Sequence, residues 1–129
     1  MFCEKNRIYG TTKKLDIDTL KKLFNDKRLS FVKVALLFGS RADGRENLKS
    51  DYDFALLMDK EADDGWGVKA KAYDLIGQIF DLDECDFDIV DLSCANSGII
   101  ESIKNSFIIL KGSEDEVSRI FAKYNKNSK

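Results

Sequence analysis

The sequence contains no histidine, and this absence removes whole classes of active site. Zinc sites that use imidazole ligands and Ser-His-Asp triads are both excluded. Any general base must therefore be a carboxylate or a less usual group. Proline is also absent, so glycine, aspartate and asparagine must mark the turns and the ends of helices and strands.

The chain also lacks a strong excess of either charge and any long apolar run. Its 21 basic and 23 acidic residues give a net charge of −2, which argues against direct nucleic-acid binding. No apolar stretch approaches the ~20 residues of a membrane span, and the N-terminus does not resemble a signal peptide. The three cysteines, Cys3, Cys85 and Cys94, form no C-x-x-C pair and fit reduced thiols. We therefore expect a cytoplasmic protein without a membrane partner.

The length of 129 residues and the 43% hydrophobic content predict one domain over residues 1–129 with a real core. Apolar periodicity predicts helices at 17–24, 68–80, 99–103 and from 113, and strands at 32–38, 51–58, 87–92 and 107–110. Asp16 or Thr12 is expected to start the first helix, and Ser113 with Glu116 forms a capping-box pattern for the last. The order α, β, β, α, β, α, β, α indicates the α+β class: a mixed sheet of about four strands flanked by helices.

The most informative stretch runs from Gly39-Ser40, through ten residues, to Asp51-Tyr52-Asp53. Asp51 and Asp53 share one face of a strand, because side chains alternate along it. Two unpaired carboxylates beside buried apolar residues would be costly, and Mg²⁺, which prefers oxygen ligands, would compensate them. The alternative is that Asp51 belongs to a solvated turn at the start of the strand.

The loop after the first strand is a candidate phosphate site, although it is not a Walker loop. Gly39 permits close approach of the backbone to a ligand, and the Ser40 hydroxyl adds a donor. Arg41 and Arg45 supply positive charge, and either is equally compatible with a plain surface position.

A third carboxylate is expected from the strand over 87–92. Asp88 is flanked by Phe87 and Ile89, so we predict that it joins Asp51 and Asp53 in a cluster that can hold two cations and accept a proton. By contrast, we expect Asp86 and Asp91 to be solvated ends of this short strand.

These motifs resemble the polymerase-beta-like nucleotidyltransferase superfamily, in particular its minimal nucleotidyltransferases (MNT proteins). The resemblance covers most of residues 31–112. It rests on Gly39-Ser40, on Asp51-Tyr52-Asp53 and on the run Asp88-Ile89-Val90-Asp91-Leu92. One departure is Asp43, which stands where a basic residue is common, and Arg45 is the expected substitute.

The resemblance implies a polymerase-beta-like core that transfers a nucleoside monophosphate from a nucleotide with release of pyrophosphate. Small MNT proteins are often antitoxins that pair with HEPN-domain RNase toxins and move AMP from ATP to a toxin tyrosine. Two alternatives stay open: a nucleotidyltransferase acting on a small molecule, and a non-catalytic module that acts by binding alone. The expected roles are Mg²⁺ or Mn²⁺ ligands at Asp51, Asp53 and Asp88, with Asp88 also the base, and nucleotide contacts at Gly39, Ser40, Arg41 and Arg45.

Overall fold

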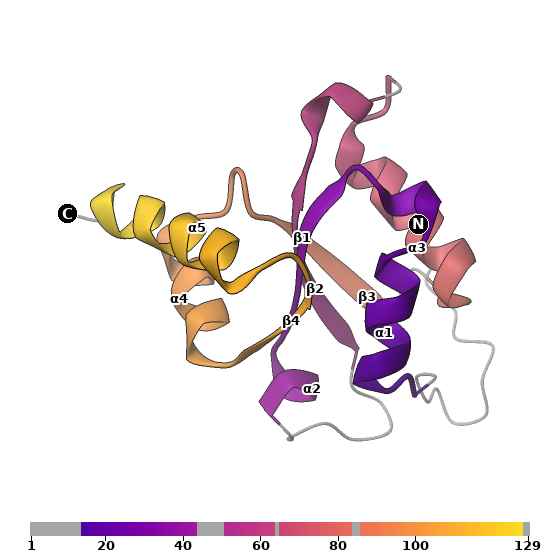
Figure 1. The fold of residues 1–129 in the computed structure, drawn as a ribbon, viewed down its shortest axis with the longest axis horizontal. Helices are drawn as coiled ribbons and strands as arrows, with labels where there is room; N and C mark the ends of the chain where they lie inside the picture. The colour runs from indigo at the N-terminus through magenta and orange to yellow at the C-terminus, as the bar shows by residue number, and fades with distance from the viewer. Residues whose placement is uncertain (1–13, 44–50, 64, 84–85, 128–129) are drawn as a thin grey trace.

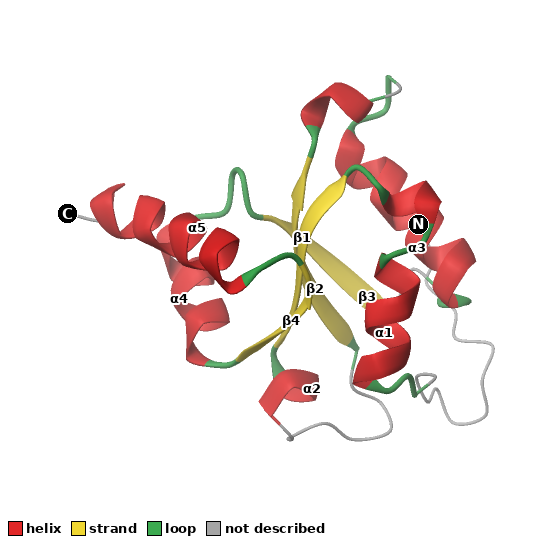
Figure 2. Ribbon diagram, in the orientation of Figure 1, coloured by secondary structure: helices red, strands yellow, loops and turns green. Residues whose placement is uncertain are grey.

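The computed structural model describes residues 14–43, 51–63, 65–83 and 86–127, which form a mixed four-stranded sheet with helices on both faces (Figure 1). The element order agrees with the predicted one, with a short helix α2 and two 3₁₀ turns added. Figure 2 shows the division into helices and strands. The helices are α1 (Ile17–Phe24), α2 (Ser40–Asp43), α3 (Val68–Phe80), α4 (Ser97–Asn105) and α5 (Glu114–Asn127). The strands are β1 (Val32–Phe38), β2 (Tyr52–Met58), β3 (Phe87–Asp91) and β4 (Phe107–Lys111), and the 3₁₀ turns are η2 (Lys27–Leu29) and η3 (Lys60–Ala62).

The strand order in the sheet is β3-β2-β1-β4. β1 pairs antiparallel with both β2 and β4, whereas β2 and β3 are parallel and joined through α3. A parallel pair needs such a crossover connection, because the chain must return to the same end of the sheet. The expected mixed sheet is therefore confirmed, with β3 and β4 as its edges.

Helices cover both faces of the sheet, so the core has two parts. Figure 1 shows α1 and α3 on one side of the strands and α4 and α5 on the other. Side chains of β2 alternate between these layers: Phe54 and Leu56 pack toward α1 and α3, and Ala55 and Leu57 pack toward α4 and α5. The four consecutive residues 34–37 of β1 are all buried because both faces are covered.

The helix ends follow the predicted chemistry. Asp16 caps α1 by accepting a hydrogen bond from the Thr19 N–H at 2.7 Å, while the alternative start, Thr12, lies outside the described residues. At α5, Ser113 Oγ accepts from the Glu116 N–H at 3.2 Å, and Glu116 Oε1 accepts from the Ser113 N–H at 3.1 Å. This reciprocal pair confirms the capping box. In the part of the chain that is described, no helix is long and apolar enough to cross a membrane.

Candidate active site

The loop after β1 lies directly against the carboxylate of Asp53. Phe38, the last residue of β1, is the register partner of Asp53 in β2, and Gly39 follows with φ of 79°. A Cβ atom at Gly39 would lie 2.4 Å from Asp53 Oδ2. Glycine is required here both by the positive φ and by this close approach.

Two of the predicted carboxylates come from neighbouring strands. Asp53 of β2 is in register with Asp88 of β3 in the parallel pair, and adjacent strands lie about 4.8 Å apart. Burial, the charge of Asp88 and the charge of Asp51 together raise the pKa of Asp53 above its ordinary value. The structure therefore brings the three predicted carboxylates to one end of the sheet.

This cluster fits a hard divalent cation. The donors are carboxylate oxygens, and a bound cation would offset both the burial and the neighbouring carboxylate charges that raise the pKa of Asp53. Within the described ranges, no group of acidic, histidine or cysteine side chains forms a ready-made metal cage. Mg²⁺ does not need one, because proteins commonly hold it with one or two carboxylates plus substrate phosphates and water.

Asp88 has a specific partner that sequence reasoning missed. Asp88 is exposed, and the Tyr73 hydroxyl from α3 donates a hydrogen bond to its Oδ1 atom. Burial and this bond raise the pKa of Tyr73 to about 12. Tyr73 lies beside the apolar stripe of α3, and the periodicity that revealed the helix gave it no role. The one available signal was a tyrosine on the helix that links the two carboxylate-bearing strands.

Of the other residues predicted to contact the nucleotide, the structure describes Arg41 and Ser40 but not Arg45. The Arg41 guanidinium lies 4.2 Å from the centre of the Tyr52 ring, so it stacks on the residue between Asp51 and Asp53. Ser40 is the first residue of α2, immediately after Gly39. Arg45, predicted to contact the nucleotide, lies outside the described residues.

A family model described as "Polymerase beta, Nucleotidyltransferase" matches residues 18–116. The chain belongs to this family. The match spans α1 to the first turn of α5 and includes Asp51, Asp53 and Asp88. The predicted resemblance is therefore confirmed at the level of the family.

Relatives within this nucleotidyltransferase family include a curated protein named "Protein adenylyltransferase MntA" from Aphanizomenon flos-aquae (strain 2012/KM1/D3). The two are 35% identical over an alignment of 71 residues, and the match covers 51% of this chain and 47% of the relative. The match thus spans about half the length of that curated relative.

Solved structures share the fold. One is described as a toxin-antitoxin with AMP-PNP, with 23% identity, a TM-score of 0.66, and coverage of 88% of this chain and 86% of the other. Another is a tri-AMPylated Shewanella oneidensis HEPN toxin in complex with MNT antitoxin, with 20% identity, a TM-score of 0.59, and coverage of 86% and 82%. At these identities the likeness establishes the nucleotidyltransferase fold.

The expectation that Asp86 and Asp91 are solvated is wrong. Both are buried, with exposed fractions of 0% and 8%. Asp86 Oδ2 accepts the Asp83 N–H at 2.9 Å, and Asp91 forms an ion pair with Lys60 and accepts the Ser93 hydroxyl at 2.7 Å. Backbone amides and one lysine supply partners that the spacing of the acids did not reveal. These partners reduce the free-energy cost of burying the two carboxylates.

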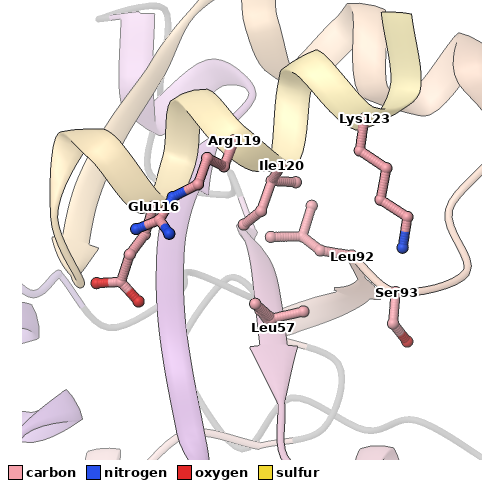
Figure 3. A pocket seen from close by; sticks show the side chains of 7 residues that line it. All are labelled: Leu57, Leu92, Ser93, Glu116, Arg119, Ile120 and Lys123. Carbon is pink, nitrogen blue, oxygen red and sulfur yellow. The ribbon is translucent and has the colours of Figure 1, made fainter. Parts of the chain in front are cut away.

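A separate cavity of about 370 Å³ lies toward the opposite end of the same sheet face (Figure 3). Leu57 is four residues along β2 from Asp53, a separation of roughly 13 Å in a strand. Figure 3 shows Leu57, Leu92 and Ile120 grouped together beneath α5, with Lys123 beside Ser93. The cavity is therefore distinct from the carboxylate cluster. Its lining residues are Leu57, Leu92, Ser93, Glu116, Arg119, Ile120 and Lys123.

Proposed function

We propose that this chain is a Mg²⁺-dependent protein adenylyltransferase and an antitoxin, which transfers AMP from ATP to a tyrosine of a HEPN-domain toxin. The observation that carries the proposal is the contact between the Gly39 turn and Asp53, with Asp88 in register on the next strand. Transfer of a nucleotide depends on positioning the phosphates beside the groups that hold the cation, so these two parts must lie side by side. The name of the MntA relative and the AMPylated toxin in a structural neighbour support the choice of reaction and partner.

The expected division of labour follows from the chemistry of the donors. Asp51, Asp53 and Asp88 would hold Mg²⁺ or Mn²⁺, which supplies charge neutralisation at the phosphates when bound. Gly39 and Ser40 would hold the β- and γ-phosphates through backbone N–H groups and the serine hydroxyl.

Arg41 and Arg45 would add positive charge near the triphosphate. Arg41 already lies at this end of the sheet, stacked on Tyr52. Because Asp43 ends the short helix α2 that contains Arg41, these two arginines are expected to offset its negative charge.

The transfer step needs positioning more than covalent chemistry from the protein. The acceptor tyrosine oxygen forms a bond to the α-phosphorus, and the bond from that phosphorus to the leaving pyrophosphate oxygen breaks. Asp88 accepts the proton of the acceptor hydroxyl. No histidine is needed for this sequence of events, in agreement with the composition.

The test is mass spectrometry after incubation of the chain with ATP, Mg²⁺ and the protein encoded next to its gene. We expect that protein to gain one or more AMP units on a tyrosine, and Asp53→Asn to abolish the gain without unfolding the chain. Asp18→Asn is the matched control, because Asp18 is an exposed carboxylate on α1, and it should label the acceptor normally.

Other outcomes identify the alternatives. Turnover of ATP with a small acceptor and no labelled protein would favour the small-molecule enzyme. Neutralisation of the neighbouring protein without ATP, and undiminished by Asp53→Asn, would favour the binding module. Either result refutes the proposed function.

A further inference from the structure

We propose that Tyr73 is a positioning residue for adenylyl transfer, because its hydroxyl fixes the carboxylate of Asp88 at the edge of the sheet. This inference rests on the proposed function, in which Asp88 is a metal ligand and the base. Tyr73 is not assigned any role by the motif that defines the site, and it comes from a different layer of the fold.

The Tyr73 hydroxyl forms two hydrogen bonds at once. It donates to Asp88 Oδ1 and accepts from the Ile89 N–H at 3.0 Å. The Ile89 N–H also lies 3.1 Å from Asp88 Oδ1. The phenol oxygen, the backbone nitrogen and the carboxylate oxygen therefore form a closed triangle, in which a change at any member displaces the other two.

The position of Asp88 on an edge strand explains why it needs this support. β3 has β2 on one side and no strand on its other side among the described residues. An exposed aspartate there is free to change rotamer unless something holds it. Tyr73 binds the outward N–H of Ile89 and the carboxylate together, so it fixes the side chain relative to its own backbone.

Tyr73 is itself held rigidly. Its ring packs on Phe87, with ring centroids 5.2 Å apart, and its helix is anchored by the buried Ala72 and Ile76. A tyrosine has only two side-chain torsions, so packing of the ring sets the place of the hydroxyl at low entropic cost. The core under α3 thus determines where Asp88 points.

The consequence for the reaction is a division between the two oxygens of Asp88. Oδ1 accepts hydrogen bonds from Tyr73 and the Ile89 N–H, so Oδ2 is the oxygen that we assign to the cation and the acceptor proton. Loss of the hydroxyl should release the carboxylate without removing it, and should slow chemistry more than it weakens nucleotide binding. We expect Tyr73→Phe to lower kcat roughly 10- to 100-fold with little change in KM for ATP, since a misplacement of 1 Å costs up to about 100-fold.

The experiment is a double-mutant cycle of Tyr73→Phe and Asp88→Asn, read as kcat and KM for ATP with the acceptor described above. Tyr73→Phe keeps the ring on Phe87, so the fold should survive, and thermal unfolding checks this. If Tyr73 acts through Asp88, it should have no further effect once Asp88→Asn is present. Asp74→Asn, at the exposed next position of α3, is the control and should behave as the unmodified chain.

A second readout does not depend on activity. Hydrogen exchange of the Ile89 amide should accelerate in Tyr73→Phe, because the amide loses one of its two acceptors and the other, Asp88 Oδ1, is no longer held in place, while exchange stays slow in the control. Unchanged exchange would overturn the proposed bond. If Tyr73→Phe lowers kcat by the same factor with and without Asp88→Asn, the two residues act independently and the positioning role is overturned.

The chain's own mass must be followed as well, because Tyr73 presents a tyrosine hydroxyl to the proposed base. AMP found on Tyr73 would overturn the positioning role and make this residue an acceptor. If the unmodified chain transfers no AMP to anything, the proposed function fails and this inference fails with it. If the unmodified chain and Tyr73→Phe transfer equally well, only the positioning role is refuted.

Discussion

Replacement of Gly39 by alanine perturbs the point where the loop after β1 meets Asp53. The φ of 79° at Gly39 is in the left-handed region, which costs a non-glycine residue about 1–2 kcal/mol. For a domain of this size, 1 kcal/mol corresponds to roughly 4 °C in melting temperature. We therefore expect Gly39→Ala to lower the melting temperature by roughly 4–8 °C.

The new methyl group should also displace the Asp53 carboxylate. Its Cβ would lie 2.4 Å from Oδ2 and 3.3 Å from Cγ of Asp53, which is too close for either atom to remain in place. Because Oδ2 is the end of a side chain, we expect the carboxylate to turn while the sheet stays closed. The added loss of stability should be small, and the loss of cation binding large.

Two measurements separate these effects. In urea denaturation, Gly39→Ala should lower the free energy of unfolding less when Asp53 is already alanine, because only the strain of the positive φ then remains. We expect this difference, the coupling free energy between the two positions, to be about 0.5 kcal/mol or more. In thermal unfolding with Mn²⁺ and ATP analogue, a ligand at 100 times its Kd stabilises by about 2.7 kcal/mol. Gly39→Ala should lose most of that stabilisation.

Two results would contradict these expectations for Gly39→Ala. A melting temperature equal to that of the unmodified chain would refute the backbone argument. If the ligand raises the melting temperature of Gly39→Ala as much as that of the unmodified chain, and the stability effects of Gly39→Ala and Asp53→Ala simply add, the close approach of the loop to the carboxylate is refuted.

Three further predictions concern other groups. Asp53→Asn should raise the melting temperature of the metal-free protein at neutral pH, because burial and nearby carboxylates raise the pKa of Asp53 and so disfavour its charged form in the folded state; a lower melting temperature would contradict this. Lys60→Met should lower the free energy of unfolding by only roughly 1 kcal/mol at neutral pH, because Lys60 is largely exposed and water screens its ion pair. Burial would raise the pKa of Asp91, but hydrogen bonds from Lys60 and Ser93 outweigh it and hold the pKa low, so this stabilisation is present above the ordinary pKa of aspartate. In urea denaturation, the difference in free energy of unfolding between Lys60→Met and the unmodified chain should vanish as the pH falls through the lowered pKa of Asp91. A difference that stays constant with pH would exclude the ion pair as its source. Tyr52→Phe should cost about 0.5–1.5 kcal/mol in urea denaturation, because the Leu15 N–H loses its acceptor at 2.6 Å, and an unchanged stability would show that water replaces the hydroxyl.

Apolar patterning predicted the elements of this fold well, because each one buries a regular face. The strand expected over 32–38 is observed as Val32–Phe38, and the helix expected over 68–80 is Val68–Phe80. The meeting of Asp53 and Asp88 was also foreseen, since both follow from strands that the same pattern places in one sheet.

The partners of individual polar side chains were not predictable in the same way. Tyr73 meets Asp88 from 15 residues away, and Lys60 meets Asp91 from 31 residues away. These contacts depend on how α3 and η3 pack against β3, which the local sequence does not encode. The wrong expectation for Asp91 has this cause: whether an acid is buried depends on a partner that is distant in the chain.

The pairing of β1 with β4 has a consequence for synthesis on the ribosome. Among the described strands β1 is made first and β4 last, and Lys111 donates a hydrogen bond to the Leu29 carbonyl across 82 residues of chain. The residues of the carboxylate cluster have all been translated before Phe107 emerges, yet one side of β1 still lacks its neighbour. An unpaired apolar strand is a template for association with other chains. Nascent chains that stall between β3 and β4 should therefore aggregate, even though they already carry every acidic residue of the site.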